Sequence, residues 1–114
     1  MHYAQLIFDA AVDKAFDYEI PPDLRGRLQP GHLVEAPFRT ATQPGIVLTL
    51  SATTTVPQLK VILRLIEPQP VMSETQLALA RWLSEQYLAP IGMCVWMMLP
   101  PLHRHDAPRP RLIK

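Results

Sequence analysis

Hydrophobic and polar positions change their spacing near residue 70 of the chain. Before that point, short alternating or β-branched apolar stretches are separated by proline and glycine, which predicts strands joined by turns. After it, apolar residues recur every three or four positions, which predicts helices. The strands are expected at 3–8, 15–21, 32–38, 45–51 and 59–66, and the helices at about 74–88 and 91–99.

Two of these elements carry signals that decide their type. The near-continuous apolar run of 59–66 also suits a helix, but its β-branched content and the closing segment 67–70, with its two prolines, favour a strand. Ser73 and Gln76 fit a capping box at the start of the first helix. The apolar stripe of that helix comprises Leu79, Leu83 and Tyr87, widened by Ala80, Trp82 and Leu88.

Five short strands followed by two helices predict an α+β fold. We expect a small antiparallel sheet, or a partly open β-barrel of about five strands, with two C-terminal helices packed on one side. The domain is expected to cover 1–102, with a β-rich part at 1–70 and a helical part at 71–102. Residues 103–114 combine prolines and charges without periodicity, which is typical of a linker.

Composition places the chain among globular domains. Its 114 residues are 48% apolar and 18% charged, enough for one modest core. No apolar run approaches the roughly 20 residues that span a bilayer, and the N-terminus shows no secretory signal. The single cysteine, Cys94, excludes an internal disulfide and suits a reducing cytoplasm; with apolar neighbours it is expected to be buried filler.

The net charge of +1 hides an asymmetry. Residues 1–103 carry seven Lys or Arg against nine Asp or Glu, a net of −2, whereas 104–114 carry four against one, a net of +3. A broad phosphate footprint needs a clustered basic face. If the body binds nucleic acid, it must therefore do so at a small, local site.

The chain lacks the usual signatures of catalysis. It has no glycine-rich phosphate loop, no G-x-S-x-G elbow and no H-E-x-x-H motif. The cluster His103-Arg104-His105-Asp106 is better explained as solvated linker than as a metal site. Nothing shows that Asp13 and Asp17 converge as a carboxylate pair. We therefore predict no catalytic residue, no metal and no cofactor in this chain.

The strand around Asp17 sets one acid between two aromatic rings. Alternation places Phe16, Tyr18 and Ile20 on one face and Asp17 and Glu19 on the other. Taken alone, this is an ordinary half-buried strand, in which the rings belong to the core and Asp17 protects a sheet edge. Small barrels also bind single-stranded nucleic acid with such rings, so the strand is a candidate binding site.

A series of short motifs runs through the chain in a fixed order. They are Phe16-Asp17-Tyr18, Val34-Glu35-Ala36-Pro37-Phe38, Gly45-Ile46-Val47, Leu59-Lys60, Trp82-Leu83, Tyr87-Leu88-Ala89-Pro90-Ile91-Gly92 and Leu99-Pro100-Pro101. Their order and spacing across 3–101 resemble the N-terminal DNA-binding domain of the bacterial replication-restart helicase PriA, or primosomal protein N-prime. The resemblance implies one domain of a longer protein, joined through 103–114 to a winged helix and a helicase core.

The resemblance also implies partners and cofactors. The family's domain recognises the 3′-terminal nucleotide of a DNA strand at a stalled or branched replication fork, without base preference. Through the full-length protein, other primosome proteins and single-strand-binding protein are possible partners. ATP, magnesium and zinc are expected only in the absent helicase region, and no membrane is involved.

Carried over residue by residue, the family's pocket falls on Phe16, Asp17, Tyr18 and Lys60. The family pattern has a glycine directly after Pro-Phe, where this chain has Arg39. Arginine does not allow the close backbone approach that glycine does, and it is a candidate for contacting a phosphate instead. A carboxylate at Asp17 suits a free 3′ hydroxyl and disfavours a 3′ phosphate. One of the two rings is expected in the core and the other in the pocket.

Two other functions remain open on sequence grounds. One is a protein-interaction module that docks a partner on an exposed apolar surface of Met93, Met97, Met98 and Trp96. Exposure of Trp96 would favour this docking module. The other is a small RNA-binding barrel.

Overall fold

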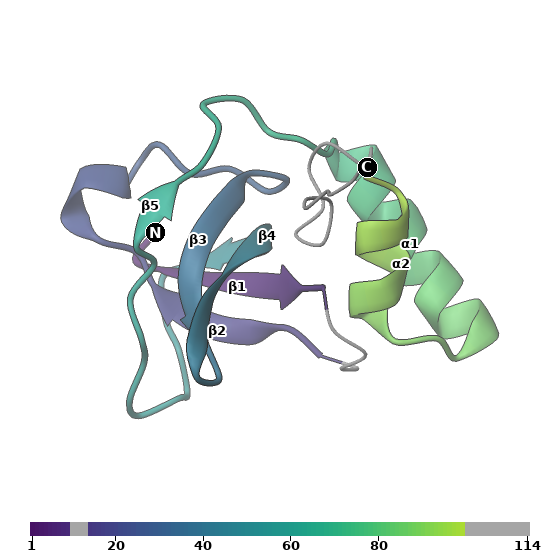
Figure 1. Cartoon of the computed structure of the whole chain (residues 1–114), viewed down its shortest axis with the longest axis horizontal. Helices are drawn as coiled ribbons and strands as arrows, with labels where there is room; N and C mark the ends of the chain where they lie inside the picture. Colours follow the sequence, from purple (N-terminus) through teal and green to yellow (C-terminus); the bar gives the residue numbers. More distant parts are fainter. Residues whose placement is uncertain (10–13, 100–114) are drawn as a thin grey trace, which may run out of the picture.

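The computed structural model describes residues 1–9 and 14–99. Its elements are β1 (Tyr3–Phe8), β2 (Phe16–Glu19), a 3-10 turn (Pro22–Leu24), β3 (Leu33–Phe38), β4 (Ala41–Ser51), β5 (Arg64–Leu65), α1 (Glu74–Tyr87) and α2 (Ile91–Met97). The strands form one antiparallel sheet in the order β2-β1-β4-β3-β5, and both helices lie together at one side of it (Figure 1). The predicted α+β class, with five strands followed by two helices, is confirmed.

The predicted strand at 59–66 is wrong in extent, because the segment changes partners along its length. Its first half pairs with β2, where the Glu19 amide donates to the Lys60 carbonyl at 3.0 Å and the Ile62 amide donates to the Glu19 carbonyl at 3.1 Å. Its second half pairs with β3, through β5 and the Leu63 amide. This segment therefore connects the two edges of the sheet, which curls towards a barrel.

Each face of the sheet has its own core. Inside the curl lie Ala4, Leu6, Phe8, Tyr18, Ile20, Leu24, Leu28, Val34, Ala36, Phe38, Val47 and Ile62. Under the helices lie Ile7, Leu33, Ile46, Leu48, Met72, Leu77, Ala80, Cys94, Val95, Trp96 and Leu99. Alternation along β1 explains the division, because Leu6 and Phe8 point into the curl while Ile7 points towards the helices. The indole Nε1 of Trp96 donates to the Ile7 carbonyl at 3.2 Å and ties α2 to β1.

The first helix begins as predicted but buries only part of the expected stripe, namely Ala80 and, partly, Leu83. The Gln76 amide donates to Ser73 Oγ at 3.1 Å and the Ser73 amide donates to Gln76 Oε1 at 2.9 Å, which confirms the capping box. The fully buried residues of α1 are Leu77 and Ala80, whereas Trp82 is 51% exposed. Leu79 and Tyr87 are exposed as well. Leu77 and Ala80 belong to the core under the helices, in which α1 packs mainly against α2 and α2 packs against β1.

The polar turn predicted at 39–44 is shorter in the structure. Phe38 pairs with Ala41, so Arg39 and Thr40 alone form the turn and β4 begins four residues earlier than expected. Pro44 is tolerated inside β4 because β1 ends opposite Gly45, so Pro44 has no β1 partner. A Cβ on Gly45 would lie 3.0 Å from the Phe8 ring, so glycine lets that ring pack on the strand.

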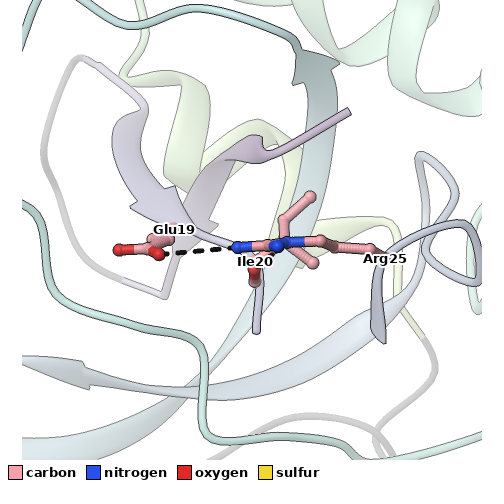
Figure 2. Close-up of polar contacts among 3 residues, drawn as sticks. All are labelled: Glu19, Ile20 and Arg25. Atoms are coloured by element: carbon pink, nitrogen blue, oxygen red, sulfur yellow. Dashed lines mark hydrogen bonds and ion pairs between the residues drawn. The ribbon is translucent and has the colours of Figure 1, made fainter. Parts of the chain in front are cut away.

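Arg25 secures the chain where β2 ends. Its Nε donates to the Ile20 carbonyl at 3.1 Å, and its guanidinium lies 3.6 Å from the Glu19 carboxylate (Figure 2). These contacts hold the chain at Glu19, whose amide donates to the Lys60 carbonyl, and at Ile20 directly after it. The start of β2 is free of them, and it is this end that forms the site described below.

Two predictions fall outside the described residues. They are the linker at 103–114, with its His103–Asp106 cluster, and the side chain of Asp13. Within the described residues, neither helix has the length and apolarity needed to cross a membrane.

Candidate functional site

A pocket lies where the sheet stops closing. The segment 59–66 pairs with β2 only at Glu19 and with β3 only as far as Glu35. The start of β2 and the end of β3 are therefore not joined by it. A pocket of about 610 Å³ occupies the gap between them. It is lined by Lys14, Ala15, Phe16, Asp17, Tyr18, Phe38, Arg39, Val56, Gln58, Leu59 and Lys60. All five residues predicted for the site are therefore brought together.

The lining contains no residue of α1 or α2, and it includes Phe38 and Arg39 at the β3–β4 turn. This turn lies away from the two helices (Figure 1). The start of β2, this turn and the loop before Lys60 contribute its walls. Because the pocket surrounds the free edge of β2, it takes atoms from both faces of that strand. This explains how Asp17 and the two aromatic residues beside it share one pocket although they alternate.

Tyr18 is the ring that belongs to the core. It is only 4% exposed, and its hydroxyl donates to the Pro37 carbonyl on β3, across the gap between the two strands. Burial raises the pKa of the Tyr18 phenol to about 12, so this hydroxyl stays a donor at neutral pH. Tyr18 thus forms the floor of the pocket and links its two sides.

Phe16 is half-buried and forms part of the wall. Its ring meets that of Phe38 edge-on, with the centroids 5.3 Å apart. Phe38 stacks in turn on Phe8, at 4.2 Å between centroids and 14° between planes. Since Phe8 and Phe38 are both buried, the wall is rigid and only Phe16 is partly open to solvent. The two rings of the motif therefore divide as expected, one in the core and one in the pocket wall.

Asp17 is held by neutral donors. Thr54 Oγ1 donates to its Oδ2 at 2.7 Å, and Gln5 Nε2 donates to its Oδ1 at 3.3 Å. Gln5 is itself oriented by the Thr49 hydroxyl, which donates to Gln5 Oε1 at 3.0 Å. Asp17 takes part in neither the ion pair of Arg25 with Glu19 nor that of Arg64 with Glu35. Its carboxylate keeps acceptor capacity for a ligand.

Three cationic side chains line the same pocket as this single carboxylate. Arg39 and Lys60 were predicted for the site, and Lys14 joins them in the lining. Lys14 Nζ lies 5.0 Å from the centre of the Phe16 ring, and the Arg39 guanidinium lies 5.0 Å from the centre of the Phe38 ring. The pocket therefore carries a local charge of +2 on a body that is acidic overall, which favours a ligand with phosphates.

The backbone at Arg39 explains why glycine suits this position. Arg39 has φ 60°, in the left-handed region that glycine enters without steric cost. The backbone conformation of the turn, and not only the approach of a ligand, therefore favours glycine at this position. The chain instead places an arginine there, at the rim of the pocket.

Sequence reasoning missed Lys14, Gln5 and Thr54. Lys14 lies just before the predicted strand at 15–21, two residues ahead of Phe16. Gln5 could have been found from strand pairing, because it lies opposite Asp17 in the β1–β2 register. Thr54 lies 37 residues from Asp17, and no pattern in the sequence connects the two.

Among the residues described, no three His, Cys, Asp or Glu side chains gather as a metal site would require.

Comparison with known proteins gives a consistent result. Residues 5–100 match the family model of the PriA 3′ DNA-binding domain (3′BD). The replication restart protein PriA of Treponema pallidum is 31% identical over 104 residues, which cover 86% of this chain and 16% of that protein. The same protein of Chlamydia pneumoniae is 29% identical over 98 residues, covering 86% of this chain and 13% of the relative. The replication restart protein PriA of Bacillus subtilis is 30% identical over 105 residues, which cover 88% of this chain and 13% of that protein. The chain thus spans about one seventh of the length of these relatives.

Proposed function

The chain belongs to the PriA 3′ DNA-binding domain family, and from this premise we propose that the pocket around Asp17 captures the 3′-terminal nucleotide of a DNA strand. The observation that carries the proposal is the convergence of Phe16, Asp17, Tyr18, Arg39 and Lys60 on one pocket. The target is a free 3′ hydroxyl end at a stalled or branched replication fork. The domain would act as the end-sensing part of a replication-restart helicase whose ATP, magnesium and zinc sites lie in other domains.

The chemistry of the pocket suits a hydroxyl end. The Asp17 carboxylate can accept a hydrogen bond from a terminal hydroxyl, whereas it repels a terminal phosphate. Internal phosphates of the same strand would lie near Lys14, Arg39 and Lys60, which neutralise them. An acid at the end of the strand and cations along it therefore define both the end and the polarity of the bound DNA.

Phe16 offers stacking without base preference. The ammonium of Lys14 occupies a face of its ring at 5.0 Å, an interaction worth about 0.5–1 kcal/mol at an exposed site. Stacking of a base on an aromatic ring is worth about 1–3 kcal/mol and tolerates any base. A terminal base can therefore replace Lys14 on the ring and release the lysine to a phosphate.

The docking module is disfavoured by the position of Trp96. Its indole is 2% exposed and donates to the Ile7 carbonyl, so it belongs to the core under the helices. Met93 and Met97 are exposed, but without Trp96 they do not form the surface on which that function depended.

The proposal is tested by fluorescence anisotropy with two short single-stranded DNAs that differ only in a 3′ hydroxyl or a 3′ phosphate. We expect binding of the hydroxyl end, and loss of about 10–100-fold in Asp17→Asn, because a hydrogen bond to a charged acceptor contributes about 1.5–3 kcal/mol. Glu19→Gln is the matched control, since Glu19 lies on the same strand outside the pocket. Equal binding of both ends, or full affinity in Asp17→Asn, contradicts end capture.

Two further ligands complete the design. Oligonucleotides that differ only in the terminal base should bind alike, because stacking and phosphate contacts carry the affinity. An RNA of the same sequence tests the RNA-binding alternative, and tighter binding of RNA would favour it.

A further inference from the structure

The loop between β4 and Lys60 is anchored on the pocket's carboxylate. Residues 52–58 are exposed with one exception, Thr54, which is half-buried. Its hydroxyl donates to Asp17 Oδ2 at 2.7 Å and accepts the Val56 amide at 3.1 Å. A local contact precedes it, in which Ser51 Oγ donates to the Thr53 carbonyl at 2.7 Å. The Thr54 hydroxyl is therefore the contact that connects this loop to β2.

The same contact determines two features of the pocket. It sets the direction of the Asp17 carboxylate, together with Gln5 on the other oxygen. It also holds the loop that supplies Val56, Gln58, Leu59 and Lys60 to the pocket wall. A carboxylate oxygen has two lone pairs, so Oδ2 can accept a second donor while it keeps Thr54.

We propose that Thr54 is a positioning residue for 3′-end recognition, acting through Asp17 and not by touching DNA. Its hydroxyl presents the carboxylate to the terminal hydroxyl in one orientation and keeps the loop against β2. This inference rests on the proposed function. Preorganisation of this kind raises affinity because fewer groups lose freedom when the ligand binds.

The alternative is that Thr54 competes with the DNA for Asp17. Its hydroxyl would then occupy the place of the DNA hydroxyl on the carboxylate, and removal of the Thr54 hydroxyl would tighten DNA binding. The partial burial of Thr54 and its second hydrogen bond, from the Val56 amide, favour positioning.

The test uses Thr54→Val, which keeps the shape of the side chain and removes the hydroxyl, and Thr54→Ser, which keeps the hydroxyl. Thr53→Val, at the exposed neighbouring position, is the matched control. Each variant is titrated with DNA ending in a 3′ hydroxyl and with the same DNA ending in a 3′-deoxy sugar. We expect Thr54→Val to lose about tenfold in affinity for the hydroxyl end, and to lose most of the preference for it over the deoxy end. Thr54→Ser should restore both, and Thr53→Val should change neither.

A second background separates this inference from the proposed function. In Asp17→Asn, the further change Thr54→Val should have little effect, because Thr54 acts through the carboxylate. If Thr54→Val binds the hydroxyl end as well as or better than the parent chain, the positioning role is wrong while end capture stands. If the parent chain shows no preference for a hydroxyl end, and Asp17→Asn binds as well, the proposed function itself fails.

Discussion

Replacing Arg39 by glycine should leave the stability of the domain nearly unchanged and weaken its binding to DNA. Arg39 has φ 60°, and a left-handed conformation costs a residue with a side chain about 1–2 kcal/mol. Glycine removes this strain but loses about 0.5–1 kcal/mol more chain entropy on folding. The relief of strain by itself therefore raises the free energy of unfolding by about 0.5–1 kcal/mol. Arg39→Gly also loses the cation over Phe38, an interaction worth about 0.5–1 kcal/mol at an exposed site, and this loss offsets the gain.

Leu88 provides a matched control within the same chain. It has φ 54°, ends α1 and is 90% exposed, so Leu88→Gly relieves the same strain without removing a packing contact or a pocket residue. Urea unfolding should show Leu88→Gly to be more stable than the parent by about 0.5–1 kcal/mol, and Arg39→Gly to be close to the parent. DNA binding should be unchanged in Leu88→Gly.

The binding assay is anisotropy over a range of salt concentrations. If Arg39 contacts one phosphate, Arg39→Gly should reduce the slope of log K against log salt by about 0.7, the value for one contact on a single strand. Affinity should fall by about two- to fivefold, because an exposed ion pair contributes up to about 1 kcal/mol. Unchanged affinity and slope would remove Arg39 from the site. Failure of Leu88→Gly to stabilise would refute the reasoning from strain.

Two further changes test the floor and the wall of the pocket. The pKa of Tyr18 is raised from 10.0 to about 12, so the stability that its burial contributes is complete below pH 10 and is lost as the pH rises towards 12. The urea midpoint of the parent chain should therefore fall between pH 10 and pH 12, whereas the midpoint of Tyr18→Phe, although lower, should change less over this range. Gly45→Ala places a methyl group 3.0 Å from the Phe8 ring, which stacks on Phe38, and thermal unfolding should show a loss of about 1–3 kcal/mol in stability. Stability equal to that of the parent would show that the Phe8 ring can shift at little cost.

Local patterns predicted the elements whose residues keep one environment along their length. β1 was predicted with its observed bounds, and the capping box located the start of α1, because alternation and capping are properties of a few neighbouring residues. The segment 59–66 was different, since its first half pairs with β2 and its second half with β3. That exchange depends on how the sheet curls, which no local window contains.

The helix stripe was only partly right, for a related reason. Of the predicted stripe of α1, Ala80 is buried and Leu83 is partly buried, whereas Leu79 and Trp82 are exposed and Leu77 is buried instead. Which stripe becomes buried depends on the shape of the surface that receives the helix. At the site, family motifs indicated four lining residues, and the departure from the motif after Phe38 indicated Arg39 as the fifth. Thr54 and Gln5 were found only in the folded chain, because their contacts with Asp17 are tertiary.

The charges of the pocket have a structural explanation that must be weighed against the functional one. The free edges of β2 and β3 beside the gap could pair with another chain, and cations such as Lys14, Arg39 and Lys60 protect such edges. Edge protection alone, however, does not account for the carboxylate. An acid among three cations would be expected to form an ion pair, yet Asp17 accepts hydrogen bonds from Thr54 and Gln5. Neutral donors orient the carboxylate without neutralising it, and an oriented anionic acceptor is what the proposed capture of a 3′ hydroxyl requires.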